Sequence, residues 1–132
     1  MGVVLESELA RISGKYRVNP VGPNSLGIIN PHANLNATFG NVTPAKGTIT
    51  FLSQSGAFAR AVIDWAVVAD MGFSKLVSLG NKTVLDECDF LEYLATDNDT
   101  DVVTLYLEDV RDGRRFMEIV RICRTSHWKR AL

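Results

Sequence analysis

The sequence has little of several features that define whole classes of protein. Its 132 residues include only two cysteines, two histidines and four prolines, and the net charge is −1. No apolar run approaches the roughly 20 residues that a membrane-spanning helix needs. The even charge balance also removes the basic surface that nucleic-acid binding requires. We therefore predict neither a nucleic-acid partner nor membrane insertion.

The two cysteines and the N-terminal residues help to predict the cellular compartment of the protein. Cys88 and Cys123 form no Cys-x-x-Cys pair, and with two histidines they make a zinc site a poor interpretation, while a disulfide between them stays open. The chain starts MGVVLESE, without a cationic segment followed by an apolar core. We expect no export signal and a cytoplasmic protein.

What is present is the composition of a folded domain. The chain is 46% hydrophobic and 22% charged, which excludes disorder, and its length fits one domain or one domain plus a small part of another. Spacing of Leu5, Leu9 and Ile12 predicts a short helix over residues 4–13, ended by Gly14. A short apolar run covers 26–29. Residues 30–47 are rich in Asn, Thr, Pro and Gly and are predicted to form a linker or functional loop.

From residue 48 the chain repeats one pattern three times, an apolar strand, a polar loop and a helix. The strands are predicted at 48–52, 75–79 and 102–107, and the helices begin near Gly56, Asp86 and Asp112. This alternation predicts βαβ units and a parallel sheet with helices on both faces. The fold class is therefore α/β, a three-layer parallel sheet of flavodoxin-like or Rossmann type.

Apolar residues at helical spacing predict which faces of the helices are buried. The expected stripes are Phe58, Ala61, Val62, Trp65 and Ala69 in the first helix, Phe90, Leu91, Leu94 and Ala95 in the second, and Phe116, Ile119, Val120 and Cys123 in the third.

The last nine residues, RTSHWKRAL, interrupt the repeat. A fourth strand is due after the third helix, and these residues show no β pattern. One interpretation is a small three-stranded domain with an irregular tail. The other, which we favour, is a fragment of a longer protein whose segment 124–132 is foreign or frame-shifted.

Polar residues follow each predicted strand and should meet at one edge of the sheet, where open α/β sheets bind ligands. These are Ser53-Gln54-Ser55-Gly56, Gly80-Asn81-Lys82 and Glu108-Asp109. Two hydroxyls and a glycine at a helix start can bind an anion through backbone N–H groups and the helix dipole. The alternative is that a serine only caps the helix.

Several other polar residues can each be interpreted in two ways. Glu108 could orient a cationic or imidazole group or act in acid–base chemistry, or it could be a solvated strand end. Asn81 and Asp86 could bind substrate or cap a helix. His32 is interpreted as a surface histidine, and His127 is given no role. Ser55 weakly resembles the nucleophile of a serine hydrolase, but such an enzyme needs an acid and a histidine on further strands.

Several motifs in order resemble one family, the NDP-forming acyl-CoA synthetases, which include ADP-forming acetate–CoA ligases; the α subunit of succinyl-CoA synthetase is a more distant relative. The motifs span residues 5–121. They are GPNSLGIINP from Gly22, NATF from Asn36, the SQSGA segment from Ser53, MGFS from Met71, SLGNK from Ser78, LEYL from Leu91 and LYLE from Leu105.

The resemblance implies a division of the chain. Residues 1–30 correspond to the C-terminal remnant of a CoA-binding Rossmann-like domain, and 31–46 to a linker. Residues 47–123 correspond to part of a succinyl-CoA-synthetase-like flavodoxin domain, and 124–132 to a tail outside the family.

The resemblance also implies chemistry. Acyl-CoA, phosphate and a nucleoside diphosphate are interconverted with the acid, CoA and a nucleoside triphosphate through acyl phosphate and a phosphohistidine. By resemblance, Ser53, Gln54, Ser55 and Gly56 bind the phosphate, Glu108 orients the histidine, and Asn24 and Asn81 lie near the CoA substrate. ATP or ADP with Mg²⁺ belongs to an ATP-grasp subunit or domain, which is the implied partner.

Departures from the family qualify that implication. The family's glycine-rich histidine loop follows a fourth strand, and neither that loop nor the ATP-grasp unit is recognisable here, so we expect the chain alone to be inactive. A protein-acetyltransferase branch tends to lack the glutamate, so Glu108 favours the ligase branch. A non-catalytic module that binds an anion or a partner remains the alternative, and homo-oligomerisation is left open.

Overall fold

The computed structural model describes residues 2–125 and 130–131 of the chain. From β3 onward, strands and helices alternate as the sequence predicts. The elements are α1 (Gly2–Tyr16), β1 (Gly27–Asn30), β2 (Leu35–Thr38), β3 (Lys46–Ser53), α2 (Gly56–Val68), β4 (Phe73–Ser78), α3 (Glu87–Leu94), β5 (Val102–Tyr106), α4 (Gly113–Thr125) and β6 (Arg130–Ala131).

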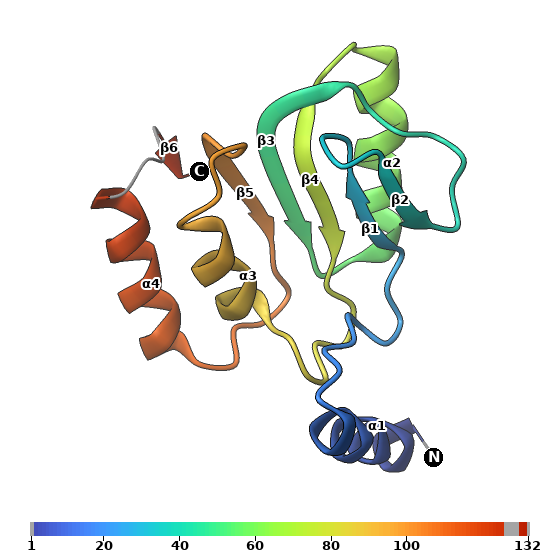
Figure 1. The fold of residues 1–132 in the computed structure, drawn as a ribbon, viewed down its shortest axis with the longest axis vertical. Coiled ribbons are helices and arrows are strands. Elements are labelled where there is room, and N and C mark those ends of the chain that lie inside the picture. The colour runs from blue at the N-terminus through green and yellow to red at the C-terminus, as the bar shows by residue number, and fades with distance from the viewer. Residues whose placement is uncertain (1, 126–129, 132) are drawn as a thin grey trace.

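All of these strands form one sheet in the order β2-β1-β4-β3-β5-β6. The central strand β3 runs parallel to β4 on one side, with Phe51 opposite Leu76, and parallel to β5 on the other. β4 is buried along its whole length, as expected of a strand covered on both faces. The carboxyl ends of β3, β4 and β5 therefore meet at one edge, which Figure 1 shows at the lower end of the sheet.

The segment 30–47 is not simply a loop, because it contains β2. β1 pairs antiparallel with β2 and also with β4, where Ile29 lies opposite Leu76. The hairpin covers the β4 edge that a three-stranded sheet would have left open, which is its physical reason for docking there. The parallel prediction thus holds for β3, β4 and β5, while the complete sheet is mixed.

Helices cover both faces of the sheet and make three layers (Figure 1). On one face α2 packs over a core that includes Phe51, Phe73 and Leu76. On the other face α3 and α4 enclose a second core around Leu52 and Val103. The three-layer, flavodoxin-like prediction is confirmed.

Most of the stripe predicted for α2 was wrong, although Val62 packs against the core as expected. The residues that α2 buries are Ala59, Ile63 and Ala66, whereas Trp65 is 55% exposed. Phe58 is partly exposed too, although its ring contacts those of Phe51 and Tyr106. Apolar residues nearly encircle this helix, so periodicity could not identify one face, and the side that meets the sheet presents mostly small side chains.

The other helices agree better with the sequence. In α3 and α4 the core residues Leu91, Leu94, Ile119 and Cys123 are buried as predicted. α1 forms where a helix was predicted, but it continues through Gly14, and its apolar residues Val3, Val4 and Leu5 are exposed. Figure 1 places α1 beyond the carboxyl edge of the sheet.

The end of the chain differs from its sequence pattern. Residues 130–131 form β6, which pairs parallel with β5 in the place of the fourth strand. His127 lies outside the described residues. The division of 1–46 and 124–132 into remnant, linker and tail stays a prediction. No helix in the described ranges has the length and hydropathy to cross a membrane.

Candidate functional site

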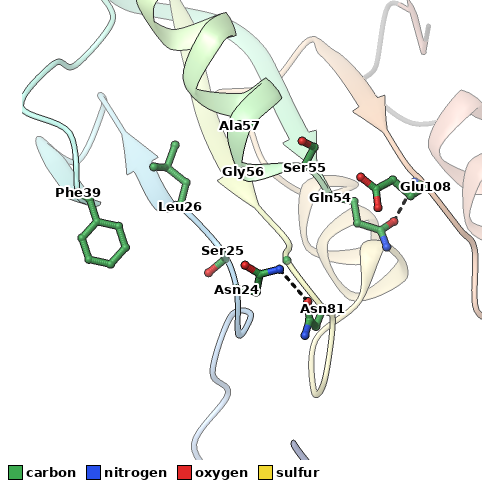
Figure 2. Close-up of a pocket in the computed structure, with 11 residues that line it drawn as sticks. Asn24, Ser25, Leu26, Phe39, Gln54, Ser55, Gly56, Ala57, Asn81 and Glu108 are labelled. Carbon is green, nitrogen blue, oxygen red and sulfur yellow. Dashed lines mark hydrogen bonds between the residues drawn. The ribbon is translucent and has the colours of Figure 1, made fainter. Parts of the chain in front are cut away.

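A pocket of about 750 Å³ opens at the carboxyl edge of the sheet, where the sequence places its polar loops. Figure 2 shows its lining residues. They come from the segment before β1, from the β2–β3 connection and from the loops after β3, β4 and β5. The lining consists of Asn24, Ser25, Leu26, Phe39, Gln54, Ser55, Gly56, Ala57, Gly80, Asn81 and Glu108. The expected convergence of the three loops is therefore present.

The loop after β3 presents the start of α2 to this pocket. Ser55 is the N-cap residue, and its Oγ accepts a hydrogen bond from the Phe58 N–H at 3.2 Å. Ser55 therefore caps α2, as one of the two sequence-based interpretations predicted. Capping uses the oxygen as an acceptor, so the hydroxyl proton remains available as a donor. Ser55, Gly56 and Ala57 line the pocket at the positive end of the helix.

Ser53 and Gln54 support this loop and have their own partners. Ser53 is fully buried, does not line the pocket, and donates its hydroxyl to the Ser55 carbonyl at 2.8 Å. Gln54 donates from Nε2 to Asp109 Oδ1 at 2.5 Å, and its Oε1 accepts from the Glu108 N–H at 3.0 Å. These bonds fix the loop after β3 against the loop after β5.

Asn24 and Asn81 lie side by side in the pocket lining (Figure 2). Asn24 Nδ2 donates to Asn81 Oδ1 at 3.3 Å, and Asn81 Nδ2 donates to Glu6 in α1 at 2.7 Å. The Asn81 backbone is bonded as well, to the Pro23 carbonyl and to Arg111. Asn81 is therefore a hub that joins several segments around the pocket.

Gly80 allows this close approach of two segments. Its φ is +59°, and a Cβ at this position would lie 2.1 Å from the Pro23 carbonyl oxygen. A larger residue would therefore displace the Pro23–Asn24 backbone from the pocket.

Glu108 lies on the opposite side of the pocket from Phe39 and near Ser55. Figure 2 shows its carboxylate directed into the pocket toward the start of α2. Its backbone N–H is held by Gln54, and within the described residues no side chain donates to its carboxylate. The next residue, Asp109, has a lowered pKa because it accepts hydrogen bonds from Lys82 and Gln54. The Glu108 carboxylate is left available to a ligand or to another chain segment.

Four lining residues were missed from the sequence, namely Ser25, Leu26, Phe39 and Ala57. Phe39 is 90% exposed on the connection between β2 and β3, and with Leu26 it makes one side of the pocket apolar. The Gly22-Pro23-Asn24 turn is the signal that could have located Ser25 and Leu26. Phe39 ends the NATF motif, but nothing in that motif placed it at the pocket, because the hairpin that positions it was predicted as loop.

The described residues offer no metal or histidine centre at this pocket. No group of three His, Cys, Asp or Glu in the described ranges could hold a metal ion. His32 bonds the Gly47 carbonyl at 2.9 Å, at the start of β3, whereas the pocket lies at the end of that strand. With no imidazole beside Ser55 among the described residues, the hydrolase alternative has no general base.

The chain matches a known domain family and several known proteins. Residues 46–128 match the succinyl-CoA ligase-like flavodoxin domain. The chain is 56% identical over 120 residues to acetate–CoA ligase (ADP-forming) I of Archaeoglobus fulgidus, covering 91% of this chain and 18% of that protein. It is 46% identical over 116 residues to the α subunit of acetate–CoA ligase (ADP-forming) II of Pyrococcus furiosus, covering 88% and 25%.

A solved structure is similar as well. The dinucleotide forming acetyl-coenzyme A synthetase 1 of Ca. Korarchaeum cryptofilum, in complex with phosphate and ADP, has a TM-score of 0.84 at 40% identity. The match covers 89% of this chain and 26% of that one. The chain thus spans about a fifth to a quarter of the length of these relatives.

Proposed function

Because this chain belongs to the succinyl-CoA ligase-like flavodoxin domain family, we propose that it supplies the phosphate-holding part of an NDP-forming acyl-CoA ligase. In that reaction a phosphate oxygen attacks the thioester carbonyl, CoA leaves as the thiolate, and acyl phosphate forms. A histidine then takes the phosphoryl group, the carboxylic acid leaves, and ADP finally receives the phosphoryl group. The complete activity belongs to the longer protein or complex, of which this chain spans a fraction.

One observation carries the proposal: the start of α2 faces the same pocket as the Glu108 carboxylate, to which no side chain in the described part of the chain donates a hydrogen bond. The Ser55 hydroxyl and the backbone N–H groups of Gly56 and Ala57 provide donors at a positive helix end, which suits phosphate. An acidic side chain does not itself attract phosphate, so Glu108 needs a different role. It would accept a hydrogen bond from the N–H of the phosphorylated imidazole and hold that ring in place.

The phosphorylated histidine has to come from outside the described residues. His32 is held at the far end of β3 and cannot reach the pocket without breaking its bond to Gly47. The same holds for the nucleotide and its Mg²⁺, which we assign to an ATP-grasp partner subunit or domain. The similarity to separately named α subunits supports a division of the enzyme into such parts.

The pocket has room for more than phosphate, and its two sides differ. Leu26 and Phe39 form an apolar side of the pocket that adjoins the start of α2, since a Cβ on Gly56 would lie 3.9 Å from the Leu26 Cβ. We assign the acyl part of the acyl phosphate to that apolar side and its phosphoryl part to Ser55. Burial of each acyl methylene against these side chains would favour binding by about 0.8 kcal/mol.

Calorimetric titration of the chain with inorganic phosphate tests this function. We expect saturable binding to wild type, and about a tenfold or greater loss of affinity in Ser55→Ala, the factor that follows from losing a hydrogen bond to a charged ligand. Titration with sodium chloride at matched ionic strength is the control for general charge effects. Absence of binding to wild type would overturn the proposal.

A turnover assay tests the division of labour. With acetyl-CoA, ADP, phosphate and an ATP-grasp subunit of a relative, we expect no ATP from this chain, because the described residues bring no histidine to the pocket. ATP formation would show that the chain supplies its own phosphoryl carrier and would contradict this part of the proposal.

A further inference from the structure

The loop after β4 contains a lysine whose charge is completely buried. Lys82 follows Asn81, has a φ of +54°, and is 1% exposed. Its Nζ lies 2.9 Å from the Asp109 carbonyl, 2.9 Å from Asp109 Oδ1 and 3.0 Å from Glu87 Oε2. One ammonium group therefore contacts the first turn of α3 and the loop after β5 together.

The carboxylate partner of Lys82 is buried as deeply. Glu87 has 0% exposure, and no hydrogen-bond donor in the described part of the chain reaches its Oε1. Burial lowers the pKa of Lys82, but the carboxylates of Asp109 and Glu87 outweigh it, so that the net pKa is raised and the group stays charged. A buried ion pair of this kind adds little stability over an apolar pair of similar size. Its presence is better explained by the geometry that it imposes.

That geometry concerns Glu108. Asp109, which Lys82 holds through two oxygens, also accepts from Gln54, and Gln54 in turn binds the Glu108 N–H. Lys82, Asp109 and Gln54 thus link the loops after β4, β5 and β3 in one chain of contacts. Glu108 lies inside this chain with its backbone fixed and its carboxylate facing the pocket.

We propose that Lys82 is a positioning residue, which fixes Glu108 at the pocket by binding Asp109 in the loop after β5. The inference rests on the proposed function for the role of Glu108, although the fixing of its backbone does not depend on any ligand. Lys82 itself does not line the pocket and is not a catalytic residue.

The test uses paired variants that remove a buried charge together with its partner, so that no unpaired charge is left inside. Lys82→Met with Glu87→Gln removes the link. Lys75→Met with Asp97→Asn is the matched control, since Lys75 and Asp97 form a second buried pair, 2.6 Å apart and away from the pocket. Backbone ¹⁵N order parameters and phosphate affinity are measured on both variants and on wild type.

We expect the order parameter of the Glu108 amide to fall from about 0.85 to below about 0.6 in the Lys82 variant and to stay unchanged in the control. Phosphate affinity should fall only in the Lys82 variant, because Gln54 joins the loop after β5 to the loop that carries Ser55. This difference should persist when the two variants have equal thermal stability. A rigid Glu108 in the folded Lys82 variant, or equal loosening in both variants, would overturn the inference.

A third variant covers the case in which the Lys82 pair does not fold. Asp109 is exposed, so Asp109→Ala should fold, and it removes the side-chain bonds to Lys82 and Gln54. It should also lower the Glu108 order parameter, and an unchanged value would count against the positioning role. If wild type binds no phosphate, the proposed function fails, while the order parameters still decide the role of Lys82.

Discussion

The two ends of the parallel strands each contain a buried lysine–carboxylate pair, but in the described ranges only the carboxyl end opens into a pocket lined mostly by polar residues. At the amino end Lys75, Asp97, Thr100, Ser74 and Thr50 bond to one another. At the carboxyl end Lys82 and Glu87 form a buried pair. Ser55, the start of α2 and Glu108 line the pocket at the same end. A polar cluster is therefore a candidate site only where some of its groups are left for a ligand.

The largest difference between the two ends is expected from substitutions of two glycines that lie in close contact with other backbone. A Cβ on Gly80 would lie 2.1 Å from the Pro23 carbonyl oxygen, and one on Gly47 would lie 2.3 Å from Gly72. Gly80→Ala and Gly47→Ala should each lower the free energy of unfolding by about 2 kcal/mol or more in urea titrations. Only Gly80→Ala should also abolish phosphate binding.

Gly14→Ala is the control for this pair. Gly14 lies inside α1 with no atom close to the Cβ position, so the change should be neutral or raise stability by up to about 1 kcal/mol. Equal loss of phosphate binding in Gly47→Ala and Gly80→Ala would mean that the two ends do not differ as described.

A second contrast separates capping from binding. Ser55 caps α2, and Asp86 caps α3 with a complete capping box, away from the pocket lining. Each change to alanine should cost about 1 kcal/mol of stability. Phosphate affinity should fall in Ser55→Ala and stay unchanged in Asp86→Ala. A parallel loss in both variants would reduce the role of Ser55 to capping.

The acid sensitivity of folding should come more from the amino end. Burial raises the pKa of Asp97, but hydrogen bonds from Lys75 and Thr100 outweigh it, and the net pKa lies below the usual value. A lowered pKa contributes stability at neutral pH that is lost as pH falls below about 4. Asp97→Asn should therefore flatten the fall in urea midpoint between pH 5 and pH 3.

Asp109→Asn is the comparison for that measurement. Asp109 also has a lowered pKa, through hydrogen bonds from Lys82 and Gln54, but it is exposed to water, which screens these interactions. It should change the acid dependence less than Asp97→Asn. The reverse order would place the acid-sensitive contacts at the pocket.

The smallest effect, the reactivity of two thiols, is expected in the core between the sheet and helices α3 and α4. Cys88 and Cys123 form no disulfide and are completely buried. Burial, together with the nearby Asp86 carboxylate, raises the pKa of Cys88 to about 11. Neither thiol should react with a thiol reagent in the folded protein at pH 8, while both should react in urea. Rapid labelling of the folded chain would show that this layer opens.

Sequence patterns were enough for the elements that alternate regularly. Strands β3, β4 and β5, the Asp86 cap and the meeting of the three loops all follow from apolar runs punctuated by polar residues. The same patterns could not show that Gln54 is used to join two loops. Its partners, Glu108 and Asp109, lie far along the chain, and only the tertiary fold brings them within reach.

The hairpin of β1 and β2 and the buried face of α2 could not be predicted from the sequence, for a different reason. The hairpin of β1 and β2 is built from strands of four residues each, and β2, with the sequence LNAT, is too short and polar for its pattern to predict a strand. Its pairing therefore depends on the exposed edge of β4 more than on its own composition. In α2 apolar residues lie on nearly every side, and packing against the sheet selects Ala59, Ile63 and Ala66 for burial. In both cases packing decided what local pattern could not.

Mapping phosphate onto the amide spectrum tests the central claim most directly. Inorganic phosphate is added to the ¹⁵N-labelled chain, and shifts are followed at every assigned backbone N–H. The account predicts the largest changes at Ser55, Gly56 and Ala57, smaller ones at Glu108 and none around Lys75 or His32. Changes centred on the amino end, or none anywhere at saturating phosphate, would contradict it.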